Sequence, residues 1–589
     1  MERKIAVSQK NELADVIIQN VRVADVFNLK WKQAEIVIAD GVIIAIAKPG
    51  EFQANQYYDG KDQFALPGLI DTHIHIESSM LTPYEFSRIM LPHGITTVIS
   101  DPHEIANVSG TAGLQFMIDN AKDAEMDILY MLPSSVPGTA FENAGATLTA
   151  TDLAPFIQEP SILGLAEVMD YPAVLAGDPA ILDKIKLAKA HHMKVDGHAS
   201  GLSTQQIRGY RAAGIETDHE CVSAEQAMDR IEQGMNVLIR EGSAAKNLKA
   251  ILPAVTSANA RRFSFCTDDK HLDELMEQGS INYAIHLAIQ EGMEPLQAIQ
   301  LATLNAAECY DLKNKGALTS GFIADIILVA DLLEMNITTV FKDGQLVVEN
   351  GVMVNKRIKP IEPPASILRS VHIPELTKKQ FSLPFVKGTT ANIIEIMPNQ
   401  ITTKKLVAEV DVINGEFQPS IEKDYLKLAV VERHHHLQTI GLAIVHGSEL
   451  KSGAVATTIA HDSHNAIVLG TNDDDMVMAL QVLQAMQGGL VVINNGQVLG
   501  ALELPVGGLM TAKPAEEVAP KLARVHEALH YIHPTLDYHL FLTLSFLSLP
   551  VIPELKLTDQ GLFDVIKFEH ISIEAESLQE VRDNENSTV

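Results

Sequence analysis

From residue 65 onward the chain repeats one pattern: a short apolar run, a polar turn and a stretch with helical spacing, such as Pro179–His191, Thr204–Ala213 and Ala224–Gly234. The apolar runs predict strands at 67–76, Ile95–Asp101, Ile128–Ser135, Ile162–Val168, Met193–His198, Ile215–Glu220, Asn236–Glu241 and Phe263–Asp268. Eight strand–helix units within about two hundred residues predict an α/β fold with a (β/α)8 TIM-type barrel, and a doubly wound open sheet is the alternative.

Segments on both sides of this repeat predict a small β-sandwich domain. Before it, alternating apolar residues and the turn at Asp40-Gly41 indicate hairpins. After it, the apolar stripe of Pro295–Tyr310 predicts a last barrel helix. Strands are then expected at Asp325–Val329, Ile337–Lys342 and Gln345–Val348. We therefore assign residues 1–64 and 316–358 to a small β-domain and residues 65–315 to the catalytic barrel.

The last part of the chain predicts a separate unit. Residues 355–375 contain four prolines among charged residues, which is typical of a linker. Beyond it, strands are expected at Leu406–Ile413 and Leu426–Val431 and a helix at Met476–Gln487, so residues 376–589 are assigned to a C-terminal α+β domain. Its segment His461–Asn465 is expected to serve as a lid, an interface or an accessory metal element, and His434, His435 and His436 to lie on a solvated strand edge.

Composition narrows the classes of partner. The sequence holds 45 basic and 75 acidic residues, a net charge of −30, so we expect no nucleic-acid partner. It shows neither a leader-like amino terminus nor an apolar run near about twenty residues, which argues against a membrane partner. Its cysteines, Cys221, Cys266 and Cys309, are too few and too far apart for a disulfide framework, and a cytoplasmic location is expected.

Polar side chains gather where the predicted barrel strands end. They are His73 and His75 after the first strand, Glu167 after the fourth, His198 after the fifth, His219 and Glu220 after the sixth, and Asp268 and Asp269 after the eighth. A single such residue is more often a packing or capping residue, but together they would converge on one mouth of the barrel. Four imidazoles and two carboxylates match the ligand needs of two divalent ions about 4 Å apart. Zinc, iron and manganese all accept these ligands.

These motifs resemble the amidohydrolase superfamily and, more narrowly, bacterial adenine deaminases. The resemblance rests on His73–Met80, Asp101–Val108, Gly164–Pro172, Asp196–His198, Ile239–Ser243, Cys266–Asp269 and His461–Asn465. Many relatives in the superfamily bridge their metals with a modified lysine on the fourth strand. Here that strand carries Glu167 and no lysine, and the resemblance implies a glutamate bridge.

The resemblance also implies a ligand set. One ion would bind His73, His75, Glu167 and Asp268, and the other would bind Glu167, His198 and His219. Asp269 competes with Asp268 for its place, and we prefer Asp268 because it directly follows the apolar strand. Two divalent ions per subunit are expected, Mn²⁺ or Fe²⁺, with Zn²⁺ as the alternative.

The implied reaction is hydrolytic deamination of adenine to hypoxanthine and ammonia, by a metal-activated hydroxide that attacks C6. Asp268 is expected to shuttle protons, and Glu220 and Glu104 are candidates for protonating the ring. Substrate contacts are expected from His103, Arg240, Glu241, Ser243 and Asp269. A cyclic amidohydrolase of the dihydroorotase or hydantoinase kind and a noncatalytic metal-binding scaffold are the alternatives. A homodimer is expected.

Overall fold

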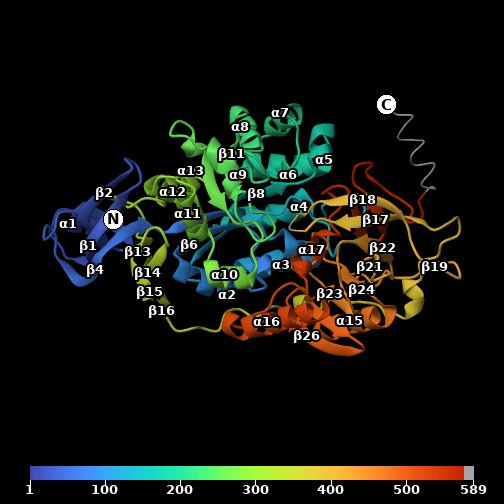
Figure 1. Cartoon of the computed structure of the whole chain (residues 1–589). Helices are drawn as coiled ribbons and strands as arrows, with labels where there is room; N and C mark the ends of the chain where they lie inside the picture. The colour runs from blue at the N-terminus through green and yellow to red at the C-terminus, as the bar shows by residue number, and fades with distance from the viewer. Residues whose placement is uncertain (399, 537, 576–589) are drawn as a thin grey trace.

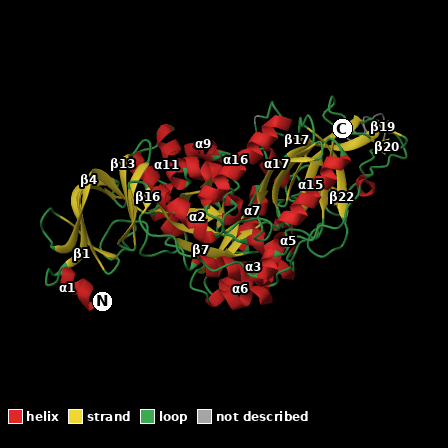
Figure 2. Ribbon diagram, turned by 90° about the horizontal axis from the view of Figure 1, so that it is seen from below, coloured by secondary structure: helices red, strands yellow, loops and turns green. Residues whose placement is uncertain are grey.

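A computed structural model describes residues 1–398, 400–536 and 538–575. Three units follow one another along an elongated molecule: a small sheet near the amino terminus, a barrel in the middle and a C-terminal unit at the far end (Figure 1, Figure 2). In the part of the chain that is described, no helix combines the length and apolar character needed to cross a bilayer.

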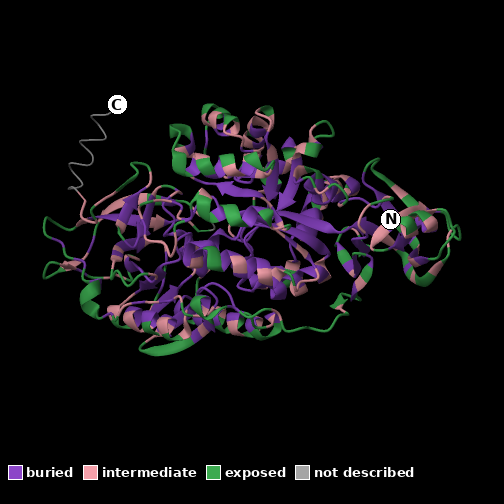
Figure 3. Cartoon of the chain, turned by 180° about the vertical axis from the view of Figure 1, so that it is seen from behind, coloured by how far each residue is buried: buried purple, intermediate pink, exposed green. Residues whose placement is uncertain are grey.

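The central unit is a barrel of parallel strands. They are β5 (Leu69–Ile74), β6 (Ile95–Ser100), β7 (Asp127–Leu132), β8 (Ile162–Val168), β9 (Lys194–Gly197), β10 (Thr217–Asp218), β11 (Asn236–Arg240) and β12 (Phe263–Cys266). Strands β5 to β9 pair in chain order, as do β10 to β12, and a parallel bridge from Ile74 to Asp268 joins the last strand back to the first. The predicted (β/α)8 barrel is therefore confirmed, and its strands are buried (Figure 3).

Helices surround the barrel where the sequence carries start signals. They include α2 (Pro83–Met90), α3 (His103–Ala121), α5 (Tyr171–Ala176), α6 (Pro179–Ala190), α7 (Thr204–Ala212), α8 (Ala224–Glu232), α9 (Leu248–Ile251), α10 (Leu272–Gln278) and α11 (Ile281–Gln290). Ser203 and Gln206 form a capping box at the start of α7, and Asp178 caps α6 with Pro179 in the first turn. Local capping thus fixes the helix starts that the spacing predicted.

The prediction of one continuous helix over Pro295–Tyr310 was wrong. It is two helices, α12 (Pro295–Ala302) and α13 (Leu304–Cys309), separated at Thr303, whose φ of −133° and ψ of −83° are not helical. The Thr303 hydroxyl donates to the Ile299 carbonyl oxygen at 2.6 Å, which offers the backbone an alternative to the helical hydrogen bond. The apolar stripe continues across the break, so periodicity alone could not reveal it.

Eight strands from both flanks of the barrel form the small sheet. They are β1 (Ala14–Asp25), β2 (Lys30–Ala39), β3 (Val42–Ala47), β4 (Ala54–Pro67), β13 (Ile326–Asp331), β14 (Asn336–Lys342), β15 (Gln345–Glu349) and β16 (Val352–Met353), in the order β16-β15-β14-β13-β4-β1-β2-β3. The predicted hairpin turn joins β2 to β3, with positive φ at both Asp40 and Gly41. Ile43 on the edge strand β3 and Phe341 on β14, in the other half of the sheet, share one apolar cluster, so the sheet curls around its own core.

The C-terminal unit is a mixed sheet covered by two long helices. Its sheet strands are β17 (Thr390–Ile396), β18 (Thr403–Glu409), β21 (Leu426–Val431), β22 (Ile440–His446), β23 (Ala454–Thr457), β24 (Ala466–Gly470), β25 (Gly489–Asn494) and β26 (Gln497–Glu503), and its main helices are α15 (Asp473–Met486), α16 (Ala515–Ile532) and α17 (Leu540–Phe546). Helix α16 contacts α2 and α10, which joins this unit to the barrel. The histidines expected on a strand edge lie instead in a loop after β21, where His435 and His436 are exposed.

Candidate active site

Six of the predicted site residues converge at the carboxyl end of the barrel. His73 Nε2 and His75 Nε2 lie 3.6 and 3.0 Å from Asp268 Oδ1. The same two nitrogens lie 3.8 and 3.3 Å from Glu167 Oε1. The carboxylates therefore share one pair of imidazoles, in the arrangement of a cation site built from histidine and carboxylate ligands.

Glu167 joins this group to a second one. Its other oxygen, Oε2, lies 2.7 Å from His198 Nδ1 and 3.2 Å from His219 Nε2. Burial raises the pKa of the Glu167 carboxyl, but hydrogen bonds from His198 and His219 hold that pKa well below its usual range. An ionised carboxylate with one oxygen toward each histidine pair is the geometry that a bridge between two cations requires.

One orphaned atom tests whether a metal fits. His73 Nε2 is buried and has no hydrogen-bond partner among the described residues. Burial lowers the pKa of the His73 imidazole to about 4, so the ring is neutral at neutral pH, and its Nδ1-protonated tautomer presents a lone pair at Nε2. A buried polar atom without a partner costs free energy, and a cation ligated by the lone pair would remove that cost. The donor set fits a metal site.

The backbone explains why Asp268 faces both histidines. Its amide donates to the His73 carbonyl oxygen at 2.9 Å, and its own carbonyl oxygen accepts from the His75 amide at 3.2 Å. Asp268 itself has a φ of +61°, a left-handed conformation that aspartate tolerates better than most residues. The barrel therefore closes at this residue, and closure places its carboxylate between the two imidazoles.

Buried carboxylates behind the strands hold the strand ends in place. Asp71 accepts from the Thr267 hydroxyl at 2.6 Å, and Asp196 accepts from the Tyr310 hydroxyl at 2.9 Å. Asp101 contacts His103 Nδ1 at 3.1 Å. The first bond ties β5 to the end of β12, the second ties β9 to the residue after α13, and the third orients His103, as orienting groups around ligand side chains commonly do.

Arg240 contacts two carboxylates beside the histidine cluster. Its Nη1 donates to Asp268 Oδ2 at 2.7 Å and also contacts Glu220 Oε1. Its sequence neighbour Glu241 is not its partner, since adjacent strand residues point to opposite faces. Glu241 instead accepts from the Leu248 amide. Glu220 and Arg240 thus stand beside the histidine cluster as one unit.

The other predicted substrate residues divide into two groups. His103 and Asp269, together with the proton-donor candidate Glu104, line the same pocket as His75, Glu167, His198 and Asp268. Glu241 and Ser243 are outside the residues that line it, and the Ser243 hydroxyl donates to Glu274 Oε2 at 2.5 Å. Their expected contact with substrate stays a prediction.

The C-terminal unit supplies the roof of this pocket. Phe546, Leu549, Ile552 and Ile401 line it, together with His461 and Asp462. An apolar roof above a charged floor suits a flat heterocycle that buries its faces and hydrogen-bonds at its edges. These apolar residues show no periodic pattern in the sequence, because they lie in or next to loops. His461 and Asp462 belong to the predicted motif His461–Asn465.

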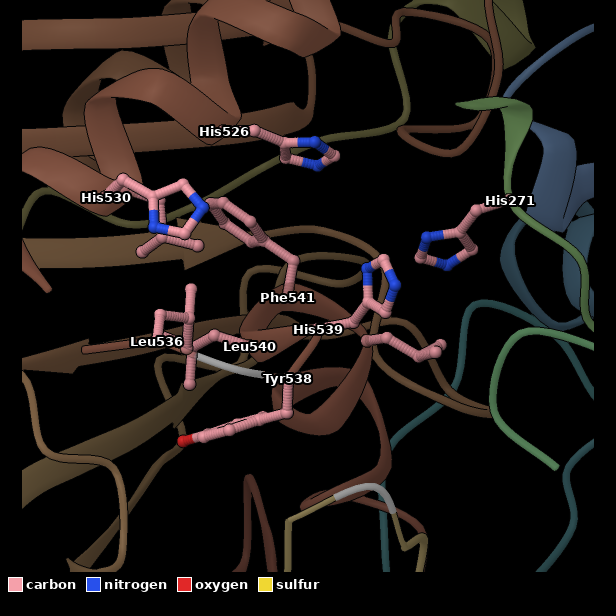
Figure 4. A pocket seen from close by; sticks show the side chains of 10 residues that line it. His271, His526, His530, Leu536, Tyr538, His539, Leu540 and Phe541 are labelled. Atoms are coloured by element: carbon pink, nitrogen blue, oxygen red, sulfur yellow. The ribbon is translucent and has the colours of Figure 1, made fainter. Parts of the chain in front are cut away.

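A second pocket, between α10, α16 and the start of α17, is also rich in histidine (Figure 4). Its imidazoles are His271, His526, His530 and His539. The described residues that line it are otherwise aromatic and aliphatic, without a carboxylate. Burial lowers the pKa of His271 to about 4. With no bridging anion in its lining, this pocket is a poorer candidate for hydrolysis than the barrel mouth.

Known proteins resemble the chain over nearly its whole length. Residues 64–347 match the Amidohydrolase family, and residues 400–569 match the Adenine deaminase C-terminal domain. The chain is 58% identical to an adenine deaminase of Lysinibacillus sphaericus, over 98% of this chain and 99% of the relative. The chain belongs to the adenine deaminase family. Adenine deaminases of Geobacillus kaustophilus and Bacillus subtilis are 50% and 47% identical to it, over 98% and 97% of this chain and 99% of each relative.

A buried lysine stabilises the roof of the pocket at the barrel mouth of this adenine deaminase family member. Lys556 donates from Nζ to the carbonyl oxygens of Ile401 at 2.8 Å and Phe546 at 2.9 Å, both on residues that line the pocket. Burial lowers the pKa of Lys556 to about 7. A lysine in an unfolded chain has a pKa of about 10.4, so above pH 7 the unfolded chain binds a proton that the folded chain lacks.

We therefore expect Lys556 to make the free energy of unfolding rise with pH from about 7 to about 10. The variant Lys556→Met should lower that slope by up to about 1.4 kcal/mol per pH unit, which corresponds to one proton. Urea unfolding across this pH range measures the slope. An unchanged slope would show that Lys556 is not the group responsible.

Proposed function

We propose that the protein catalyses the hydrolytic deamination of adenine to hypoxanthine and ammonia at the mouth of the barrel. The observation that carries the proposal is Glu167, whose two oxygens face two separate pairs of histidines. The names of the relatives support adenine as the substrate. The apolar roof over the charged floor of the pocket supports a flat ring as the shape of the substrate.

Two divalent ions are proposed as cofactors, Mn²⁺ or Fe²⁺, with Zn²⁺ as the alternative. His73, His75 and Asp268 would hold one ion, His198 and His219 the other, and Glu167 both. When bound, such ions supply the Lewis acidity that makes water nucleophilic at neutral pH. The orphaned nitrogen of His73 and the split oxygens of Glu167 support this ligand set.

Asp268 is proposed to move protons. Arg240 holds the side chain through Oδ2, and the carboxylate positioned in this way would take a proton from the attacking water and return it to the departing amine. The water oxygen ends on C6. One water proton leaves as part of ammonia, and the other is retained on the ring nitrogen N1. Glu220 and Glu104, the two candidates for protonating the ring, both accept hydrogen bonds from positively charged or imidazole groups, which favours their ionised forms.

An ammonia-release assay combined with elemental analysis tests this function. The purified protein is expected to release ammonia from adenine, to lose that activity on chelation and to regain it when Mn²⁺ or Fe²⁺ is restored. Dihydroorotate and hydantoin are expected to remain unhydrolysed. Turnover of a cyclic amide without turnover of adenine would favour the cyclic amidohydrolase, and bound metal without any turnover would favour a scaffold.

A homodimer is proposed as the assembly, and the domain boundaries at residues 64, 315 and 376 remain proposals as well. Light scattering after gel filtration measures the first. Limited proteolysis tests the second, because exposed linkers such as the proline-rich stretch 355–375 should be cut before the packed units.

A further inference from the structure

Glu104, at the start of α3, lies between two histidines of the C-terminal unit. His461 Nδ1 is 2.6 Å from Glu104 Oε1, and His464 Nε2 contacts Glu104 Oε2. All three side chains are buried. Both oxygens of one barrel carboxylate are therefore used to hold a loop that follows β23, far along the chain.

Hydrogen bonds decide which atoms of this triad carry protons. The Ala460 amide donates to His464 Nδ1 at 3.1 Å, so that nitrogen is an acceptor and the ring proton of neutral His464 lies on Nε2. Nε2 then donates to Glu104. A cation could bind there only after this nitrogen lost its proton, so the triad is better described as a hydrogen-bonded support than as a third metal site.

The His461 ring is fixed on several sides. Its backbone amide donates to the Ser545 carbonyl oxygen at 3.0 Å, and its carbonyl oxygen accepts from Ser548 Oγ at 3.2 Å. The ring stacks on Phe546 with centroids 4.5 Å apart and planes 19° from parallel. These contacts leave the imidazole little rotational freedom, so the direction of its free nitrogen is set in advance.

The other ring nitrogen of His461, Nε2, is available to the pocket that His461 lines. With Nδ1 engaged by Glu104, Nε2 of His461 has no hydrogen-bond partner within the described part of the chain, and His461 lines the pocket that contains Arg240 and Asp269. A donor held by a buried carboxylate and facing a cavity resembles the arrangement by which active sites orient a histidine.

We propose that His461 donates a hydrogen bond from Nε2 to a ring nitrogen of the bound purine, and that Glu104 and His464 are positioning residues for it. The inference rests on the proposed function. When C6 becomes tetrahedral, electron density moves from the C6–N1 bond onto the ring, and a fixed donor there stabilises that charge. The C-terminal unit would thus complete a site whose other polar groups come from the barrel.

The surroundings keep His461 charged. Three carboxylates face it, those of Glu104, Asp269 and Asp462, and one further imidazole, that of His464. Burial lowers the pKa of His461, but Glu104 and Asp269 raise it, to about 9 in all. His461 is therefore an imidazolium near neutral pH, and hydrogen bonds from charged donors are the stronger kind.

The variant His461→Gln tests the proposal against the matched variant His435→Gln. His435 is an exposed histidine of the same unit. We expect kcat/KM for adenine to fall by about 10²- to 10³-fold in His461→Gln, the usual effect of removing one such donor. Metal content and circular dichroism are expected to match the wild type in both variants, and His435→Gln should keep wild-type kinetics.

Deaza analogues identify the hydrogen-bond acceptor. Inhibition constants of 1-deaza-, 3-deaza- and 7-deazaadenine are measured on the wild type and on His461→Gln. We expect His461→Gln to weaken the binding of two of the analogues by about 10- to 100-fold. Binding of the third should not change, because that analogue lacks the nitrogen that accepts the hydrogen bond in the wild type. Weakening of all three would mean that His461 acts on the pocket as a whole, and it would overturn the proposal.

The two positioning residues have their own readout. In Glu104→Gln the upper limb of the pH profile of kcat/KM should move from near 9 toward neutrality, because the carboxylate that raises the pKa of His461 is gone. An unmoved limb, or a kcat/KM for His461→Gln within a few-fold of wild type, would overturn the inference. Loss of one metal equivalent in His461→Gln and His464→Gln would replace it with a third metal site. Failure of the wild type to deaminate adenine would instead contradict the proposed function.

Discussion

Replacing Glu167 with glutamine is expected to remove both the bound metal and the activity. Glutamine keeps the size of the side chain but loses the charge, and its amide nitrogen cannot take the place of the second oxygen. Because Glu167 faces both histidine pairs, one substitution should weaken both cation sites. Metal catalysis is worth several kcal/mol, so ammonia release from adenine should fall by at least about 10³-fold.

Elemental analysis of Glu167→Gln should find fewer than two metal equivalents per chain. The matched control is Glu35→Gln. Glu35 is a buried glutamate of the small sheet that accepts from Gln19 and from the Gly50 amide, remote from the barrel mouth. That variant should keep its metal and its turnover. Full metal content with wild-type turnover in Glu167→Gln would contradict the bridge.

The barrel and the floor of the site could be predicted from the sequence for a simple physical reason. Each barrel strand is a short apolar run, and parallel strands present their carboxyl ends at one mouth. Residues such as His73, Glu167 and His219, separated by long stretches of chain, could therefore be placed together before any coordinates. The same logic fixed the strand boundaries to within a few residues.

The roof and the partners of individual charges could not be predicted in this way. Phe546 and Ile401 reach the pocket through packing between units, for which a single sequence carries no period or spacing. The pairing of Arg240 with Glu220 depends on which strands are neighbours in space. The link between Glu104 and His461 joins residues that are 357 positions apart in the chain. Such contacts follow from the assembled barrel and not from any local pattern.

The choice between the two aspartates after β12 leads to the second large effect. Asp268 faces His73 and His75 through Oδ1 and Arg240 through Oδ2. Asp269 accepts instead from Ser78 Oγ at 2.5 Å. We expect Asp268→Asn to lower kcat by about 10²- to 10⁴-fold, the range for loss of a general acid or base, and to weaken metal binding.

The neighbouring variant Asp269→Asn is the matched control, since it differs by one position and keeps the same volume change. It should retain two metal equivalents and alter KM for adenine more than kcat, as expected for a residue that lines the pocket and is not one of the proposed metal ligands. Steady-state ammonia release and elemental analysis on both variants give the comparison. If Asp269→Asn lost metal and kcat while Asp268→Asn kept both, the ligand and proton-shuttle roles would pass to Asp269. Barrel closure would then place between the two imidazoles a carboxylate that does not carry the chemistry.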